Sequence, residues 1–138
     1  MSFRNQTRMR EFKTTLRIDG EHLDQYGHVN YRSLPLLYEI AQDRALEECG
    51  LSFQGLETKY GLRSFVRRTE ADYFDQLFEG DDVLVTTSVN IRNTSMIFDQ
   101  YMEKGQKRTS QLKLIVVTVD SEGRKTAVPD DIKEAFKV

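Results

Sequence analysis

The chain of 138 residues contains a single cysteine, Cys49, which excludes an intrachain disulfide framework and a cysteine-rich metal site. Its only histidines, His22 and His28, are six positions apart with no cysteine near them, so a histidine-based metal cluster is also missing. No glycine-rich nucleotide-binding loop is present. We therefore expect neither a metal site nor a cofactor.

A strong excess of charge and a long apolar run are missing as well. The net charge of −2 gives no reason to expect nucleic acid or an anionic membrane as a partner. No apolar run approaches the roughly 20 residues of a membrane-spanning helix, and no signal-peptide segment follows the start. Arg4, Arg8 and Arg10 are interpreted as a polar terminus. We expect one globular domain over residues 1–138, in the cytoplasm.

The most informative stretch is a polar turn that leads into one long helix. Apolar residues then recur at helical spacing, at Leu34, Leu37, Tyr38, Ala41, Ala45 and Cys49. Leu36, Ile40 and Leu46 widen this stripe, so we expect the helix to be covered on most sides. The predicted helix runs from about Asn30 to Cys49, with Asn30 or Ser33 as its cap.

Alternating apolar and polar residues predict five strands around this helix. The strands are expected at 12–18, 63–74, 83–91, 96–102 and 111–120, with a loop at 51–61 and a short helix from Pro129. In the second strand, Phe65, Thr69, Ala71 and Tyr73 are expected on one face. Short turns imply antiparallel neighbours, and a long apolar helix on such a sheet gives an α+β fold. Its exposed strand edges favour dimerisation.

The polar turn also places chemistry at the positive end of the predicted helix. Asp24, His28 and Asn30 precede it, and the unpaired N–H groups of a helix start can hold an oxyanion. Each residue has a structural interpretation too. Asp24 can form a turn, His28 can be a hydrogen-bonded structural histidine, and Asn30 can be a helix cap.

The turn resembles the signature of hotdog-fold acyl-CoA thioesterases of the 4-hydroxybenzoyl-CoA thioesterase type. That signature is an aspartate, two residues, Gly-His-Val-Asn and the central helix. Here it is Asp24-Gln25-Tyr26-Gly27-His28-Val29-Asn30-Tyr31. Later landmarks of the resemblance are Ala71-Asp72-Tyr73-Phe74, Leu77, Gly80-Asp81, Val119-Asp120, Gly123-Arg124 and Val128-Pro129. It covers the chain from about Phe12 to Phe136 and departs at the helix entry, Arg32 to Pro35, so the acyl group stays undefined.

This resemblance implies an α+β hotdog fold, with a five-stranded antiparallel sheet wrapped around one long central helix. It implies hydrolysis of an acyl-CoA thioester to free acid and coenzyme A. Asp24 would be the nucleophile or the general base, and the helix start near Tyr31 would hold the oxyanion. Gly27, His28 and Asn30 would shape the loop around the substrate. The expected assembly is a homodimer or homotetramer with sites at the subunit interface.

The phosphates of coenzyme A require cations. The densest basic cluster contains Lys59, Arg63, Arg67 and Arg68, of which Arg67 and Arg68 are the predicted substrate-binding residues. A second cluster contains Arg92, Lys104, Lys107 and Arg108.

Other interpretations remain open. Glu39 is a rival carboxylate, because another hotdog branch carries its catalytic acid on the central helix. The alternative function is a non-catalytic hotdog protein that binds an acyl thioester or acts as an assembly module. A dehydratase is less favoured, because the motif is of the thioesterase type.

Overall fold

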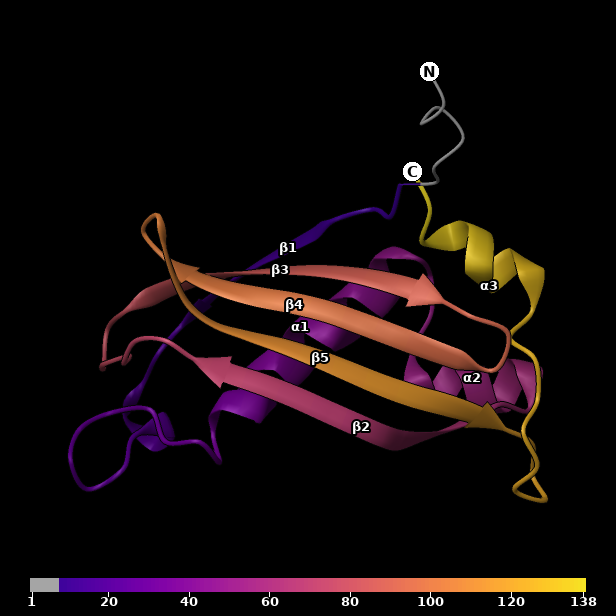
Figure 1. Ribbon diagram of the computed structural model, residues 1–138, viewed down its shortest axis with the longest axis horizontal. Helices are drawn as coiled ribbons and strands as arrows, with labels where there is room; N and C mark the ends of the chain where they lie inside the picture. Colours follow the sequence, from indigo (N-terminus) through magenta and orange to yellow (C-terminus); the bar gives the residue numbers. More distant parts are fainter. Residues whose placement is uncertain (1–7) are drawn as a thin grey trace.

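One curved antiparallel sheet packs against one long helix (Figure 1). The structure is a computed structural model that describes residues 8–138, so Arg4 of the basic terminus lies outside the described residues. The strands are β1 (Phe12–Arg17), β2 (Arg63–Tyr73), β3 (Asp82–Ile91), β4 (Ser95–Lys104) and β5 (Lys107–Val119). The helices are the 3₁₀ turn η2 (Gly20–His22), α1 (Leu34–Glu48), α2 (Phe53–Tyr60) and α3 (Asp130–Ala135).

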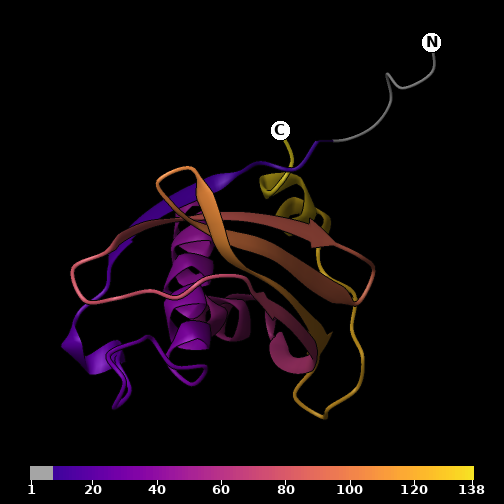
Figure 2. The ribbon, with the colours of Figure 1, turned by 60° about the vertical axis from the view of Figure 1, so that its left-hand side comes forward.

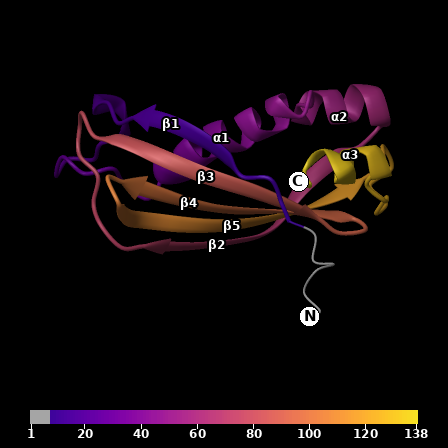
Figure 3. The same ribbon diagram turned by 90° about the horizontal axis from the view of Figure 1, so that it is seen from above.

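The strand order in the sheet is β1-β3-β4-β5-β2, and every neighbouring pair is antiparallel. Tight turns join β3 to β4 and β4 to β5, whereas β1 and β2 form the two edges. Seen from above, α1 and α2 lie on one side of the sheet (Figure 3). The predicted five-stranded antiparallel sheet with one long helix is therefore confirmed.

The helical spacing of apolar residues in α1 explains how this helix packs. Leu37, Tyr38, Ala41, Ala45 and Leu46 are at most 1% exposed and form the core with the sheet. Burying each large side chain of this kind stabilises the fold by about 1.5–3 kcal/mol.

The outer side of α1 corrects the expectation that the helix is covered on most sides. Leu36 and Ile40 face away from the sheet and are 59% and 38% exposed. The helix also begins at Leu34 rather than at Asn30, because residues 31–33 form a turn.

The segment at 51–61, expected as a loop, contains the helix α2. The Ser52 side chain caps it by accepting a hydrogen bond from the Gly55 N–H at 2.8 Å. Gly61 ends it with a φ of 69°, a conformation that glycine adopts without strain. Leu56 anchors the helix in the core. Two glycines indicated a loop, but one sits in the capped first turn and the other is the helix stop.

A bulge corrects the predicted faces of β2. The pairing with β5 shifts between Val66 and Arg68, so Arg67 is an extra residue in the edge strand. Phe65 pairs with Val117, whereas Thr69 pairs with Leu114. Because one added residue inverts the alternation of side chains, Phe65 lies on the sheet face opposite to Thr69.

Cys49 lies partly buried at the end of α1, with its Sγ 3.5 Å from the Ala135 carbonyl oxygen. Burial raises the pKa of the Cys49 thiol. A raised pKa disfavours the reactive thiolate, which agrees with a packing role for Cys49. Among the described residues, the structure contains no helix with the length and apolar character needed to cross a membrane.

Candidate active site

The residues of the predicted site lie in a tight loop between η2 and α1, below the N-terminal end of the helix in Figure 2. Leu23 and Val29 pair across the loop, and the Asp24 N–H donates to the His28 carbonyl oxygen at 2.8 Å. Gly27 turns the chain with a φ of 80°. No atom lies within 4 Å of the position of an added Cβ, so this position requires glycine for its backbone conformation.

The carboxylate of Asp24 is held by its own loop. Its Oδ1 accepts hydrogen bonds from the backbone N–H groups of Tyr26 and His28, at 2.9 and 3.2 Å. Its Oδ2 accepts no hydrogen bond from residues 8–138. One oxygen therefore fixes the side chain while the other is available for chemistry.

The imidazole of His28 packs edge-on against the ring of Phe78, with ring centroids 5.1 Å apart. The main chain of His28 bonds to Asp24 through both its N–H and its carbonyl group. These contacts agree with a residue that shapes the loop.

Asn30 caps the entry to α1. Its Oδ1 accepts hydrogen bonds from the N–H groups of Arg32 and Ser33, at 2.8 and 2.9 Å. The N–H of Tyr31 donates no hydrogen bond to residues 8–138. An unpaired N–H at the positive end of a helix can stabilise a negative oxygen.

Two neighbouring cavities surround this helix entry. The outer cavity of 540 Å³ is bordered by Asp24, Gln25, His28, Val29, Asn30, Tyr31, Arg32 and Gln76. The inner cavity of 130 Å³ is bordered by Val29, Asn30, Tyr31, Leu34, Tyr73, Asp75, Gln76, Leu77, Thr109 and Ser110. They share four residues, two of which are Tyr31 and Gln76. Asp24 and Tyr31 therefore border the same outer cavity, and Tyr31 also borders the inner one.

The structure of one chain does not bring every predicted residue to this space. Arg67 and Arg68 lie on the edge strand β2 and border neither cavity. Arg68 forms an ion pair with Glu70. Glu39 borders a separate groove of 310 Å³ between α1 and β2, together with Val66.

The second basic cluster is largely paired within the chain. Lys104 lies 3.0 Å from the Asp81 carboxylate, and Lys107 lies 3.0 Å from Asp75. The hydrogen bond from Lys107 lowers the pKa of the Asp75 carboxyl. These lysines are therefore engaged with acids of the loop that follows β2.

Arg32, Gln76 and Ser110 are among the cavity residues that were not predicted from the sequence. The N–H of Val29 donates to the Leu77 carbonyl oxygen at 3.0 Å and so ties the loop after β2 to the turn. This contact joins segments almost fifty positions apart, and no local pattern marks it. For these three residues, the only indication in the sequence was the positive charge of Arg32 next to the Asp24–Tyr31 motif.

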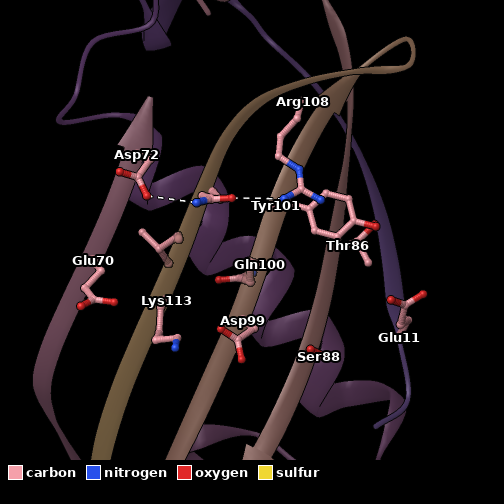
Figure 4. A pocket seen from close by; sticks show the side chains of 12 residues that line it. Glu11, Glu70, Asp72, Thr86, Ser88, Asp99, Gln100, Tyr101, Arg108 and Lys113 are labelled. Carbon is pink, nitrogen blue, oxygen red and sulfur yellow. Dashed lines mark hydrogen bonds between the residues drawn. The ribbon is translucent and has the colours of Figure 1, made fainter. Parts of the chain in front are cut away.

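A further hollow of 370 Å³ lies on the sheet face opposite to α1, where Figure 4 shows α1 behind the strands. Its polar side chains bind one another. The Gln111 amide donates to Asp72 at 3.0 Å and accepts from Arg108 at 3.1 Å. The Arg108 guanidinium also stacks 4.0 Å from the centroid of the Tyr101 ring. The sheet separates this hollow from Asp24.

Asp19, Glu21 and His22 bring potential metal-ligand atoms within 4.8 Å of one another. The capping of η2 explains this group. Asp19 Oδ1 accepts from the Glu21 N–H, and His22 Nδ1 accepts from the Asp19 N–H.

Comparisons with known proteins agree with this architecture. The model of the thioesterase-like superfamily matches residues 20–136. No curated protein matches the chain.

Several solved structures are similar. A 1,4-dihydroxy-2-naphthoyl-CoA thioesterase from Synechocystis is 16% identical with a TM-score of 0.85, over 92% of this chain and 96% of that chain. A protein from Staphylococcus aureus in complex with CoA is 17% identical with a TM-score of 0.82, over 95% and 84%. A predicted thioesterase from Bacillus stearothermophilus is 25% identical with a TM-score of 0.77, over 92% and 94%.

Proposed function

Because the chain belongs to the thioesterase-like superfamily, we propose that it is an acyl-CoA thioesterase. We propose further that Asp24 and the backbone N–H of Tyr31 carry out its chemistry. One observation carries the assignment of residues. Asp24, whose carboxylate is fixed and has one free oxygen, and Tyr31, whose N–H is unpaired in the turn before α1, border the same cavity. Hydrolysis of a thioester needs these two functions, a base or nucleophile and an oxyanion donor.

In the proposed reaction the thioester carbonyl oxygen accepts a hydrogen bond from the Tyr31 N–H. Asp24 Oδ2 then either removes a proton from an attacking water or attacks the carbonyl carbon itself. In the first route a tetrahedral intermediate forms, and its collapse breaks the C–S bond. In the second, the attack breaks the C–S bond, expels the coenzyme A thiolate and leaves an acyl-aspartyl anhydride, which water hydrolyses to the free acid and the carboxylate of Asp24. Both routes release the free acid and coenzyme A, whose thiolate takes up the proton.

Loop residues support these two groups. Asn30 occupies the N–H groups of Arg32 and Ser33, so they do not compete with Tyr31 for the substrate oxygen. Arg32 borders the outer cavity and has no ion pair within residues 8–138, so its charge is available to coenzyme A. Arg32 therefore joins Arg67 and Arg68 as a proposed phosphate-binding residue.

The proposed assembly is a homodimer through the edge strand β2. Long exposed edges with apolar side chains favour pairing with another chain. Phe65, Val66, Tyr73 and Phe74 are all more than half exposed on or beside this edge. A two-fold axis would align two β2 strands antiparallel, so the Arg63 end of one would lie beside the Tyr73 end of the other. Arg63 of one protomer would then approach the inner cavity of its partner, which Tyr73 borders, whereas Arg67 and Arg68 would lie at the centre of the paired strands.

A panel of acyl-CoA esters tests the proposed function through the release of free coenzyme A thiol. We expect hydrolysis of at least one ester, with loss of turnover in Asp24→Asn. Binding of several esters without hydrolysis of any would instead support the non-catalytic alternative.

A further inference from the structure

The loop between β2 and β3 contacts the turn before α1 at two successive positions of that turn. The Val29 N–H donates to the Leu77 carbonyl oxygen at 3.0 Å, and the His28 imidazole packs against the Phe78 ring. The imidazole nitrogens of His28 form no hydrogen bond within the described part of the chain. The contact with Phe78 is therefore the interaction that orients the His28 side chain.

The position of His28 determines the position of Asp24, because two hydrogen bonds join these residues. The His28 N–H donates to Asp24 Oδ1 at 3.2 Å, and the Asp24 N–H donates to the His28 carbonyl oxygen at 2.8 Å. A shift of His28 would therefore move the carboxylate. A displacement of about 1 Å at a reacting group can lower a rate by about 100-fold.

The Phe78 ring does not belong to the apolar core. It is 43% exposed and lies in neither of the two clusters of buried apolar residues. Since stabilisation by burial scales with the apolar area removed from water, this ring contributes little to the stability of the fold. Its contact with His28 is therefore not a by-product of core packing.

Asp81 and Lys104 hold Phe78 in place. Asp81 Oδ2 accepts hydrogen bonds from the Phe78 N–H at 2.8 Å and from Lys104 Nζ at 3.0 Å. Lys104 Nζ also lies 5.6 Å from the centroid of the Phe78 ring, within the range of a cation–π contact. One carboxylate oxygen and one ammonium group thus fix both the main chain and the ring of Phe78.

We propose that Phe78 is a positioning residue for Asp24, and that Lys104 acts through Phe78 rather than through the substrate. The contacts run from Lys104 to the Phe78 ring, from that ring to His28, and from His28 to the carboxylate. They hold Asp24 at the border of the outer cavity. This inference rests on the proposed thioesterase function, because it assigns residues that support Asp24 in that reaction.

Steady-state kinetics on the best acyl-CoA ester separate positioning from substrate binding. Phe78→Leu keeps an apolar side chain but removes the ring, so kcat should fall at least about tenfold while KM changes less than about threefold. Phe78→Tyr keeps the ring and should retain most of the wild-type kcat. Lys104→Met should lower kcat about threefold, the size of an exposed cation–π contact.

Lys137→Met is the matched control for Lys104→Met. The Lys137 side chain is 35% exposed, against 41% for Lys104, and it also pairs with an acid, Glu134, at 3.1 Å. Its replacement should leave kcat and KM unchanged. A raised KM with a normal kcat in Lys104→Met would show that Lys104 binds coenzyme A and would overturn its assigned role. A normal kcat in Phe78→Leu, or an equal loss in Phe78→Tyr, would overturn the role of Phe78.

Amide hydrogen exchange, measured by NMR, tests the same contacts without turnover. The N–H groups of Tyr26 and His28 bind Asp24 Oδ1, and they should exchange faster in Phe78→Leu than in the wild type and in Lys137→Met. If the wild type hydrolyses no ester, the thioesterase proposal fails and the exchange still decides this inference. Faster exchange in Phe78→Leu would uphold the positioning of Asp24 by Phe78, and equal exchange would overturn it.

Discussion

Asp24 and Asn30 use their side chains in the same way, because each accepts hydrogen bonds from nearby backbone N–H groups. Asp24 Oδ1 binds the N–H groups of Tyr26 and His28, and Asn30 Oδ1 binds those of Arg32 and Ser33. The N–H of Tyr31 lies between these two sets and remains free within residues 8–138. The structural roles expected for Asp24 and Asn30 are thus compatible with the proposed chemistry, since they isolate one donor.

Thr14 presents the opposite case, a buried polar group without a partner. Its side chain is 2% exposed and its Oγ1 has no hydrogen bond within the described residues. A buried hydroxyl without a partner costs roughly 1–3 kcal/mol. Replacing it with the similarly shaped valine should raise the free energy of unfolding by about 1 kcal/mol, measured by urea denaturation at fixed protein concentration.

Thr15→Val is the matched control, because Thr15 is the exposed neighbour on the same strand. We expect its effect to stay within about 0.5 kcal/mol. A Thr14→Val protein less stable than the wild type would show that the hydroxyl has a partner.

Buried hydrogen bonds between α1 and the sheet fix the orientation of the helix. Tyr38 reaches Ser110 on β5, while Gln42 donates to Gln100 on β4 at 2.9 Å. The Gln100 amide in turn donates to the Tyr38 carbonyl oxygen and to Thr87 Oγ1. These buried polar contacts set the rotation of the helix on an otherwise apolar interface.

The raised pKa of Tyr38 gives this contact a pH dependence. Between pH 10 and pH 12 the unfolded chain loses the Tyr38 proton, whereas burial keeps it in the folded chain, whose Tyr38 pKa is about 12. The unfolded state then binds fewer protons, so stability falls as pH rises. Each unit of pKa difference corresponds to about 1.4 kcal/mol, which gives a loss of roughly 2 kcal/mol by pH 12.

Urea denaturation of the wild type and Tyr38→Phe at pH 9 and pH 11.5 measures this contribution. The wild type should lose more stability over this range than the variant, because only the wild type carries the buried phenol. Equal losses in both proteins would show that Tyr38 titrates alike in the folded and unfolded states.

Local patterns were sufficient for most elements and insufficient for two features. Alternation and helical spacing predicted the strands and α1, because side-chain burial repeats every two or every 3.6 residues. The bulge at Arg67 could not be predicted from the residue pattern of β2 alone, because it is defined by the pairing of β2 with β5. Helix α2 was missed because Gly55 and Gly61 indicated a loop.

The residues of the candidate site also divide into those that a local pattern predicts and those that it does not. Asp24 to Tyr31 form one local motif, so their grouping could be predicted. Gln76 comes from the loop after β2, which the contact of Val29 with Leu77 holds in place, and Ser110 comes from β5, which is placed by its pairing in the sheet. Contacts between segments that are far apart in the chain produce no periodic residue pattern, so a single sequence does not predict them.

The two edges of the sheet differ, and this difference concerns the whole molecule. β1 has 6 residues, whereas β2 has 11 and carries exposed apolar side chains. Val66 is 65% exposed on that edge. In the proposed dimer, Val66→Lys would replace an apolar side chain of each protomer with a charge that association must desolvate, which should weaken association at least about 100-fold.

Analytical ultracentrifugation at micromolar concentration measures this effect. The wild type should sediment as a dimer or a larger assembly, and Val66→Lys should sediment as a smaller species with reduced hydrolysis. Val138→Lys is the control, because Val138 is 83% exposed and lies away from β2. A wild type that is monomeric at this concentration would contradict the assembly through β2.

The proposal that Asp24 carries the chemistry is tested most directly by the turnover number of Asp24→Asn on the best thioester. Asparagine keeps the size of the side chain and an oxygen that can accept from Tyr26 and His28, but it is neither nucleophile nor base. We expect turnover to fall at least roughly 100-fold, while substrate binding survives. Tyr31→Phe should cost far less, because the backbone N–H remains. Near-normal hydrolysis by Asp24→Asn would contradict the account and make Glu39 the next residue to replace.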